Sequence, residues 1–120
     1  MPKLIDANVI LRYLLNDNMD MAAEAKRVIE SGAYTTGEIL AEVVYVLKGV
    51  YKVDRLDIAT CLTTMLTEID IQHPEVYRKA LTIFTNKNLD FVDCVLIARH
   101  QILGDEVFSF DRKLNHNLEE

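Results

Sequence analysis

The stretch Lys3-Leu4-Ile5-Asp6-Ala7-Asn8-Val9-Ile10-Leu11 indicates how this chain of 120 residues folds. Its first residues suit a short strand, and the apolar residues after Asp6 suit a mostly buried helix over residues 8–15. An acidic residue therefore stands where the strand gives way to the helix. The same alternation of a short strand and a longer helix continues along the rest of the sequence.

The remaining elements follow from apolar spacing and from the residues that begin or end helices. Asp54 suits the start of a helix, while Gly32 and Gly104 suit the ends of two others. Further helices are expected at 19–31, 37–48, 55–67, 74–85, 91–103 and 112–118, and further strands at 33–36, 69–71 and 106–110.

Short strands that alternate with helices imply parallel crossover connections. We therefore expect an α/β fold of three layers, α/β/α, with a central, mostly parallel sheet of four or five short strands. The length predicts a single domain over residues 1–120. The carboxyl ends of parallel strands lie at one edge of a sheet, which is where ligands bind in such folds. Asp6 and Asp111 both occupy positions of that kind.

The composition excludes several classes of protein. Half of the residues are apolar, with only four glycines and two prolines, which is not the composition of a disordered or collagen-like chain. No apolar run approaches the roughly 20 residues of a membrane span, so we expect a cytoplasmic protein. Cys61 and Cys94 lie in apolar, helical surroundings and are interpreted as core residues.

The net charge of −6 argues against a nucleic-acid binder that relies on a simple basic patch. It remains compatible with a nucleic-acid enzyme whose acidic residues are covered by metal ions.

Helix capping explains some of the acidic residues but not all of them. Asp6, Asp90 and Asp111 each begin a predicted helix, and capping by one aspartate contributes about 1 kcal/mol. Asp93 differs because it lies inside an apolar helix, in the first turn. Glu42 also lies among apolar neighbours that leave it little polar helix face.

Asp6, Glu42, Asp93 and Asp111 come from four separate elements. If they converged without a cation, they would destabilise one another. Hard carboxylate ligands suit Mg²⁺ or Mn²⁺, and the sequence offers no histidine or cysteine spacing typical of zinc.

Four blocks of sequence together resemble the PIN domain family, specifically the small VapC-type toxin ribonucleases of bacteria and archaea. The resemblance covers almost the whole chain. Each block alone is a weak signal, but four in this order and at this spacing are a strong one. The blocks are residues 6–12 (DANVILR), 42–47 (EVVYVL), 90–98 (DFVDCVLIA) and 108–114 (FSFDRKL).

The resemblance implies Mg²⁺- or Mn²⁺-dependent hydrolysis of an RNA phosphodiester bond. It also implies that Asp6, Glu42, Asp93 and Asp111 are the acidic quartet of the active site. We expect Asp6 and Asp93 to bind metal directly and Asp111 to do so directly or through water. Glu42 would hold a water molecule on the metal or a second ion.

Other residues in the same blocks suit contacts with water or RNA. By the resemblance, Asn8 and Ser109 orient water or an acid. Arg12, Arg112 and Lys113 are positioned to steer phosphate, although they equally suit the role of balancing nearby acids.

The resemblance further implies two kinds of protein partner. One is an antitoxin whose inhibitory segment occupies the acidic groove, and the other is a second copy in a homodimer. The candidates for a dimer surface, which are equally candidates for the core, are Tyr13, Leu14, Tyr45 and Tyr51. Few residues follow Asp111, whereas relatives commonly add a further strand.

Three alternatives compete with a ribonuclease. The first is a catalytically inactive PIN-like module that binds RNA or protein, and the presence of all four acids argues against it. The second is a receiver domain or an aspartyl phosphatase, but Asp6 is followed by Ala7 and Asn8 rather than by the required acid. The third is a purely structural helical protein, in which replacing Asp6 or Asp93 would be neutral or stabilising.

Overall fold

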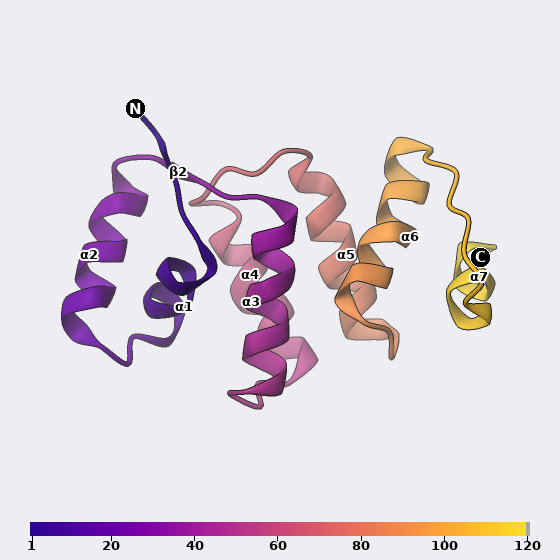
Figure 1. Cartoon of the computed structure of the whole chain (residues 1–120), viewed down its shortest axis with the longest axis horizontal. Helices are drawn as coiled ribbons and strands as arrows, with labels where there is room; N and C mark the ends of the chain where they lie inside the picture. Colours follow the sequence, from indigo (N-terminus) through magenta and orange to yellow (C-terminus); the bar gives the residue numbers. More distant parts are fainter. Residues whose placement is uncertain (120) are drawn as a thin grey trace. The chain divides into compact units, whose positions relative to one another are not determined.

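The structure is a computed structural model that describes residues 1–119, and the chain divides into two compact units. The first unit runs from Met1 to Gln72 and the second begins at His73. Figure 1 shows the order of the elements along the chain. No helix within residues 1–119 combines the length and the apolar character that a membrane span requires.

The first unit contains two strands and four helices, coloured indigo to pink in Figure 1. They are β1 (Lys3–Leu4), α1 (Ala7–Leu15), α2 (Met19–Glu30), β2 (Ala33–Tyr34), α3 (Gly37–Gly49) and α4 (Arg55–Met65). The second unit contains α5 (Pro74–Asn86), α6 (Phe91–Leu103) and α7 (Arg112–Leu118). All seven predicted helices are therefore confirmed, with ends that shift by two residues or fewer.

Local capping accounts for the accuracy of these helix ends. Asp54 accepts a hydrogen bond from the amide of Asp57 at 2.9 Å, as its N-cap position predicts. Gly32 and Gly104 have φ angles of +103° and +75°, a region that glycine enters without a steric penalty. Both glycines follow helices directly or closely, and both terminate them as expected.

The sheet is smaller than the sequence predicts. β1 and β2 are parallel, with Lys3 opposite Ala33 and Leu4 opposite Tyr34. The strand predicted at 69–71 is reduced to one parallel bridge between Tyr34 and Asp70. That bridge is nevertheless hydrogen-bonded on both sides, from Asp70 N to the carbonyl of Ala33 at 3.0 Å and from Thr35 N to the carbonyl of Asp70 at 2.9 Å.

The strand predicted at 106–110 is not formed, so the structure does not confirm a sheet of four or five strands. Phe108 and Phe110 are 83% and 91% exposed and stack edge to face with ring centroids 5.2 Å apart. Alternating apolar residues predicted a strand there, but a strand also requires a neighbour to pair with its backbone. Within residues 1–119, the regular sheet is the parallel pair of β1 and β2.

Each unit has its own apolar core. In the first unit, fully buried residues of α1, α3 and α4 include Ile10, Leu40, Val43, Ile58 and Leu62. In the second, α5 packs on α6 and buries Val76, Leu81, Phe84, Cys94 and Ala98. Cys94 is thus a core residue as predicted, whereas Cys61 is half-buried.

Candidate active site

Asp6 stands between β1 and α1, at the carboxyl end of the strand. Its backbone is extended, and its Oδ1 accepts a hydrogen bond from the amide of Val9 at 3.0 Å. The aspartate therefore caps α1 and holds its carboxylate at the strand end. A carboxylate has about four lone-pair sites, so capping leaves lone pairs of Asp6 that are able to bind a cation.

A pocket of about 540 Å³ adjoins Asp6 in the first unit. Residues of β1, α1 and α2 line it, and they include three of the residues singled out in the sequence: Asp6, Asn8 and Arg12. Most of the wall is apolar, with Leu4, Val9, Met21 and Val28 among the lining residues. The lining also includes two cations and three acids, which are Lys3, Arg12, Asp6, Asp20 and Glu24.

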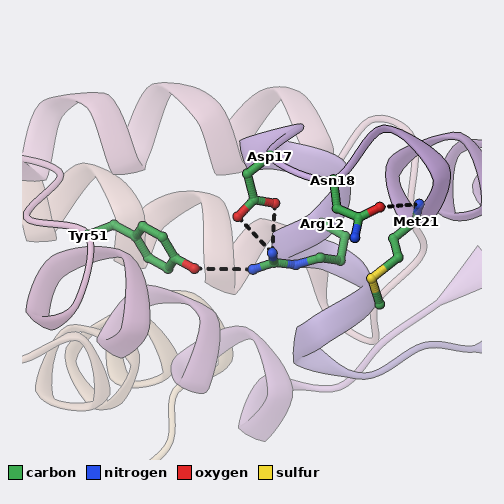
Figure 2. A network of polar contacts seen from close by, with 5 residues as sticks. All are labelled: Arg12, Asp17, Asn18, Met21 and Tyr51. Atoms are coloured by element: carbon green, nitrogen blue, oxygen red, sulfur yellow. Dashed lines mark hydrogen bonds and ion pairs between the residues drawn. The ribbon is translucent and has the colours of Figure 1, made fainter.

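Arg12 is held in a polar network on the first unit, shown in Figure 2. Its Nη1 contacts both carboxylate oxygens of Asp17, at 2.6 and 2.7 Å, and its Nη2 donates to the hydroxyl of Tyr51 at 3.2 Å. The hydrogen bond with Tyr51 and the charge of Asp17 outweigh the opposing effect of burial and raise the pKa of Arg12. Within residues 1–119, its Nε is buried without a hydrogen-bond partner.

Asn18, next to this network, caps α2 by accepting a hydrogen bond from the amide of Met21 at 3.0 Å (Figure 2). The turn between α1 and α2 thus carries both the carboxylate that fixes Arg12 and the cap that begins α2. Arg12, one of the predicted phosphate contacts, consequently has an intramolecular carboxylate partner.

Glu42 lies on α3, and its side chain is exposed. The expectation that its apolar neighbours leave it little polar helix face is wrong, because Glu42 is exposed while Val43 and Val44 are buried. Glu38, one turn earlier, is exposed as well. Solvation of Glu42 therefore does not depend on a bound cation.

Asp93 lies in the first turn of α6, as predicted, and is half-buried. Burial, followed by the negative charges of Asp90 and Asp111, raises the pKa of the Asp93 carboxyl group. Asp90 occupies the N-cap position of α6 but makes no side-chain capping hydrogen bond, so its predicted role as a cap is wrong. Its carboxylate instead adds to the negative charge around Asp93.

Asp111 begins α7 and accepts a hydrogen bond from the amide of Leu114 at 2.9 Å. Ser109 accepts a hydrogen bond on its Oγ from the amide of Asp111 at 3.0 Å. Ser109 therefore fixes the backbone that carries the acid. Arg112, the next residue, is exposed in the first turn of α7.

Asn115 and Lys113 of α7 hold the segment that carries Ser109 and Asp111. The sequence did not identify either residue in this role. Asn115 donates from Nδ2 to the carbonyl of Ser109 at 2.8 Å. Lys113 donates from Nζ to the carbonyl of Asn88, in the segment before α6. The contact of Lys113 spans 25 positions, and that of Asn115 requires the chain to turn back on itself, so helical periodicity alone could not have identified either one.

The quartet divides between the units, with Asp6 and Glu42 in the first and Asp93 and Asp111 in the second. In neither unit, over residues 1–119, do three histidine, cysteine, aspartate or glutamate side chains form a group that could hold an ion. The chemistry of the donors still fits a hard divalent cation. Asp93 carries a half-buried carboxyl group whose ionised form is disfavoured by two other acids, and a cation relieves that repulsion.

Comparison with known proteins identifies the family of the chain. A family model of the PIN domain matches residues 3–117, which span both units. A protein from Aquifex aeolicus (strain VF5), the VapC ribonuclease, is 25% identical over 119 residues, which is 92% of this chain and 88% of the relative. The matched range includes the four blocks that contain Asp6, Glu42, Asp93 and Asp111, and the chain accordingly belongs to the PIN domain family.

Proposed function

We propose that the protein is a Mg²⁺- or Mn²⁺-dependent endoribonuclease that hydrolyses RNA phosphodiester bonds. We further propose that it is the toxin of a toxin–antitoxin pair. Support comes from the PIN family match over residues 3–117 and from the likeness to a VapC ribonuclease. The two compact units would act together as one PIN-like domain, because the family match spans both.

The observation that carries the proposal is the environment of Asp93. A half-buried carboxyl group beside Asp90 and Asp111 is costly to ionise, and the buried residues of α6 are all apolar. Acids whose pKa is raised by burial and by neighbouring like charges are typical of functional sites. Asp93 is therefore the residue with the clearest need for a cation.

In the proposed mechanism, the carboxylates of Asp6 and Asp93 would hold the metal directly, and Asp111 would do so directly or through water. Glu42 would hold a water molecule on the metal or a second ion. When bound, a divalent ion supplies Lewis-acid stabilisation of charge on the phosphate oxygens and makes water a better nucleophile. Ser109 keeps the backbone of Asp111 fixed, which limits the reorganisation needed for binding.

The substrate would be positioned by polar groups near these acids. Asn8 shares the pocket with Asp6 and is proposed to orient water or substrate. Arg112 is exposed beside Asp111 and suits a phosphate contact. Arg12 can serve the same purpose if RNA phosphate takes the place of the Asp17 carboxylate, since both present oxygen atoms to the guanidinium fork.

The proposed partners are RNA, an antitoxin and a second copy of the chain. An antitoxin arginine or lysine placed among the carboxylates would compete with Mg²⁺. Of the residues considered for a dimer surface, Tyr45 and Tyr51 are 77% and 41% exposed, whereas Tyr13 and Leu14 are half-buried. An RNA substrate places the proposed activity in the cytoplasm.

The decisive experiment is RNA cleavage with Mg²⁺, with Mn²⁺ and in EDTA, comparing the native chain with Asp6→Asn and Asp93→Asn. We expect cleavage that requires the metal and a loss of at least about 100-fold in each variant, as for other removed electrostatic contacts to a transition state. Full residual activity in both variants would show that neither Asp6 nor Asp93 is needed for catalysis.

Asp57→Asn is a matched control for this experiment. The segments Asp54-Arg55-Leu56-Asp57 and Asp90-Phe91-Val92-Asp93 place two acids at the same positions of α4 and α6. Asp57 is exposed, and we expect its replacement to leave cleavage unchanged. A general loss of activity through weakened helix starts would affect Asp57→Asn and Asp93→Asn alike.

A second candidate is an inactive PIN-like module that binds RNA or protein without cutting. RNA binding that persists without any cleavage, in Mg²⁺ and in Mn²⁺, would identify this alternative.

A further inference from the structure

The junction between α3 and α4 gathers positive charge in a chain whose net charge is −6. An open depression of about 580 Å³ lies there, lined by Lys48, Lys52, Val53, Asp54, Arg55 and Leu56. Three cationic side chains against one carboxylate give this surface a local excess of positive charge. We refer to Lys48, Lys52 and Arg55 together as the α3–α4 basic site.

The two lysine charges of the α3–α4 basic site are not paired with its own carboxylate within residues 1–119. Asp54 caps α4, because one of its carboxylate oxygens accepts a hydrogen bond from the amide of Asp57 at 2.9 Å. Lys48 and Lys52 are exposed, and neither ammonium group forms an ion pair with any residue from 1 to 119. Both groups are therefore available to an anion from outside the protein.

Lys52 is held in place rather than carried on a loose loop. Its φ angle is +57°, a left-handed conformation that a lysine adopts only when its surroundings impose it. Hydrogen bonds flank it, from Tyr51 N to the carbonyl of Val46 at 3.2 Å and from Val53 N to the carbonyl of Leu47 at 3.0 Å. The hydroxyl of Tyr51 is also fixed by Arg12 (Figure 2).

An aromatic ring accompanies the cations. Tyr45 is 77% exposed and precedes Lys48 by one turn of α3, so the two side chains are neighbours on the helix surface. Exposed rings beside lysine and arginine are typical of surfaces that bind single-stranded nucleic acid, where bases stack on the rings and phosphates meet the cations. The N-terminus of α4, which has 11 residues, adds the positive end of a helix dipole.

We infer that the α3–α4 basic site binds the phosphate backbone of single-stranded RNA. The inference rests on the proposed ribonuclease function, which supplies the substrate, and it gives that substrate a binding surface outside the carboxylate quartet. An acidic protein needs such a surface, because its net charge repels the polyanion that it is proposed to cut. Contacts of this kind position RNA without reading its sequence.

The test compares two double variants in the Asp93→Asn background, which is expected to leave RNA uncut. Lys48→Gln/Lys52→Asn removes two cations while keeping the fold, because glutamine suits a helix and asparagine tolerates positive φ. Lys26→Gln/Lys79→Gln makes the same change of charge at exposed positions of α2 and α5 and serves as the control. Affinity for a labelled single-stranded RNA of about 16 nucleotides is measured over a range of KCl concentrations.

We expect the Lys48→Gln/Lys52→Asn variant to bind several-fold more weakly than the control. The slope of log affinity against log salt should fall by about 1.4, which corresponds to roughly 0.7 for each lost phosphate contact on a single strand. Equal weakening in both double variants would overturn the inference, because overall charge would then explain the effect. Unchanged RNA affinity with an altered oligomeric state would also overturn it and assign the surface to a protein contact.

A kinetic measurement separates this inference from the proposed function. In the chain that retains Asp93, the Lys48→Gln/Lys52→Asn change should raise KM for RNA cleavage and leave kcat unchanged. Normal cleavage with an unchanged KM would overturn the basic site alone. If no form of the protein cleaves RNA but the two double variants still differ in binding, the proposed ribonuclease fails and the RNA-binding surface stands.

Discussion

The phenolic hydroxyl of Tyr13 on α1 donates a hydrogen bond to the carboxylate of Glu68, which lies 55 positions later in the turn after α4. This contact joins two distant stretches of the first unit. The hydrogen bond to Glu68 and, to a smaller extent, burial raise the pKa of Tyr13 to about 12. Both effects favour the neutral phenol over the phenolate.

Tyr13→Phe should lower the free energy of unfolding by about 1 kcal/mol at neutral pH, a magnitude typical of a hydrogen bond to an exposed charged group. The pKa is about 12 in the folded state and near its ordinary value of 10.0 in the unfolded state. The stabilisation is thus fully present below pH 10 and is lost as the pH rises towards 12. Urea unfolding across this range should show the native chain and the variant converging.

Tyr34→Phe provides the comparison for that experiment. Tyr34 is 42% exposed, and its hydroxyl has no hydrogen-bond partner among residues 1–119. Its replacement should leave stability unchanged at every pH. A difference between native chain and Tyr13→Phe that stays constant up to pH 12 would show that Glu68 does not hold the phenol proton.

Asp93→Asn should make the metal-free protein more stable even though it is expected to impair the proposed cleavage. A neutral amide avoids the repulsion from Asp90 and Asp111 and is easier to bury than a carboxylate. We expect a gain of roughly 0.5–1 kcal/mol, the size of one or two partly screened charge contacts. Thermal melting in EDTA measures it as an increase in Tm.

Mg²⁺ should reverse the order of Tm of the native chain and Asp93→Asn. A ligand that binds only the folded state raises its stability, so the native chain should gain more in Tm from Mg²⁺ than Asp93→Asn does. Asp57→Asn, at the same helix position of α4, should lose slightly in EDTA and respond to Mg²⁺ like the native chain. An Asp93→Asn variant that melts below the native chain in EDTA would contradict the crowding of acids at α6.

The Arg12 network predicts unequal effects for its two partners. Asp17→Asn should lower the free energy of unfolding more, because it removes an ionic contact in which Nη1 of Arg12 meets both carboxylate oxygens. Tyr51→Phe removes a single hydrogen bond from the guanidinium to an uncharged phenol and should cost about half as much. Urea unfolding of both variants tests the ranking, and a larger loss in Tyr51→Phe would show that the buried part of the network depends on the phenol instead.

The parts of the structure that the sequence predicts are those determined within a few residues. Asp54 and Asp111 begin their helices, and Gly104 ends one, because capping involves groups only one turn apart. Asp90 shows the limit of this reasoning: its position in the chain is that of a cap, but its carboxylate makes no capping bond.

Features that need distant partners were less predictable. The apolar alternation at 106–110 gives no information about whether another strand pairs with it. The sequence places Arg12 near acidic residues, but its contact with Tyr51 spans 39 positions and could not be predicted from local spacing. The blocks around Asp6, Glu42, Asp93 and Asp111 could still be identified, because each is a short run of residues in a fixed order.

Asn115 should be a positioning residue for the proposed active site. Its amide fixes the carbonyl of Ser109 at 2.8 Å, and Ser109 in turn accepts from the backbone of Asp111 at 3.0 Å. Asn115→Ala should therefore lower kcat about 3- to 10-fold with little change in KM, since small displacements of a catalytic group cost rate rather than binding. Asn115→Gln, which retains the amide, should recover part of the loss.

The control for Asn115 is Asn86→Ala at the end of α5. Asn86 makes the same type of contact, from its Nδ2 to the carbonyl of Thr82 at 3.1 Å, but fixes no acid. Both alanine variants should lose similar stability in urea, so a shared loss of cleavage would reflect weakened folding. Only a selective decrease of kcat in Asn115→Ala supports the view that this amide acts through the loop of Ser109 and Asp111.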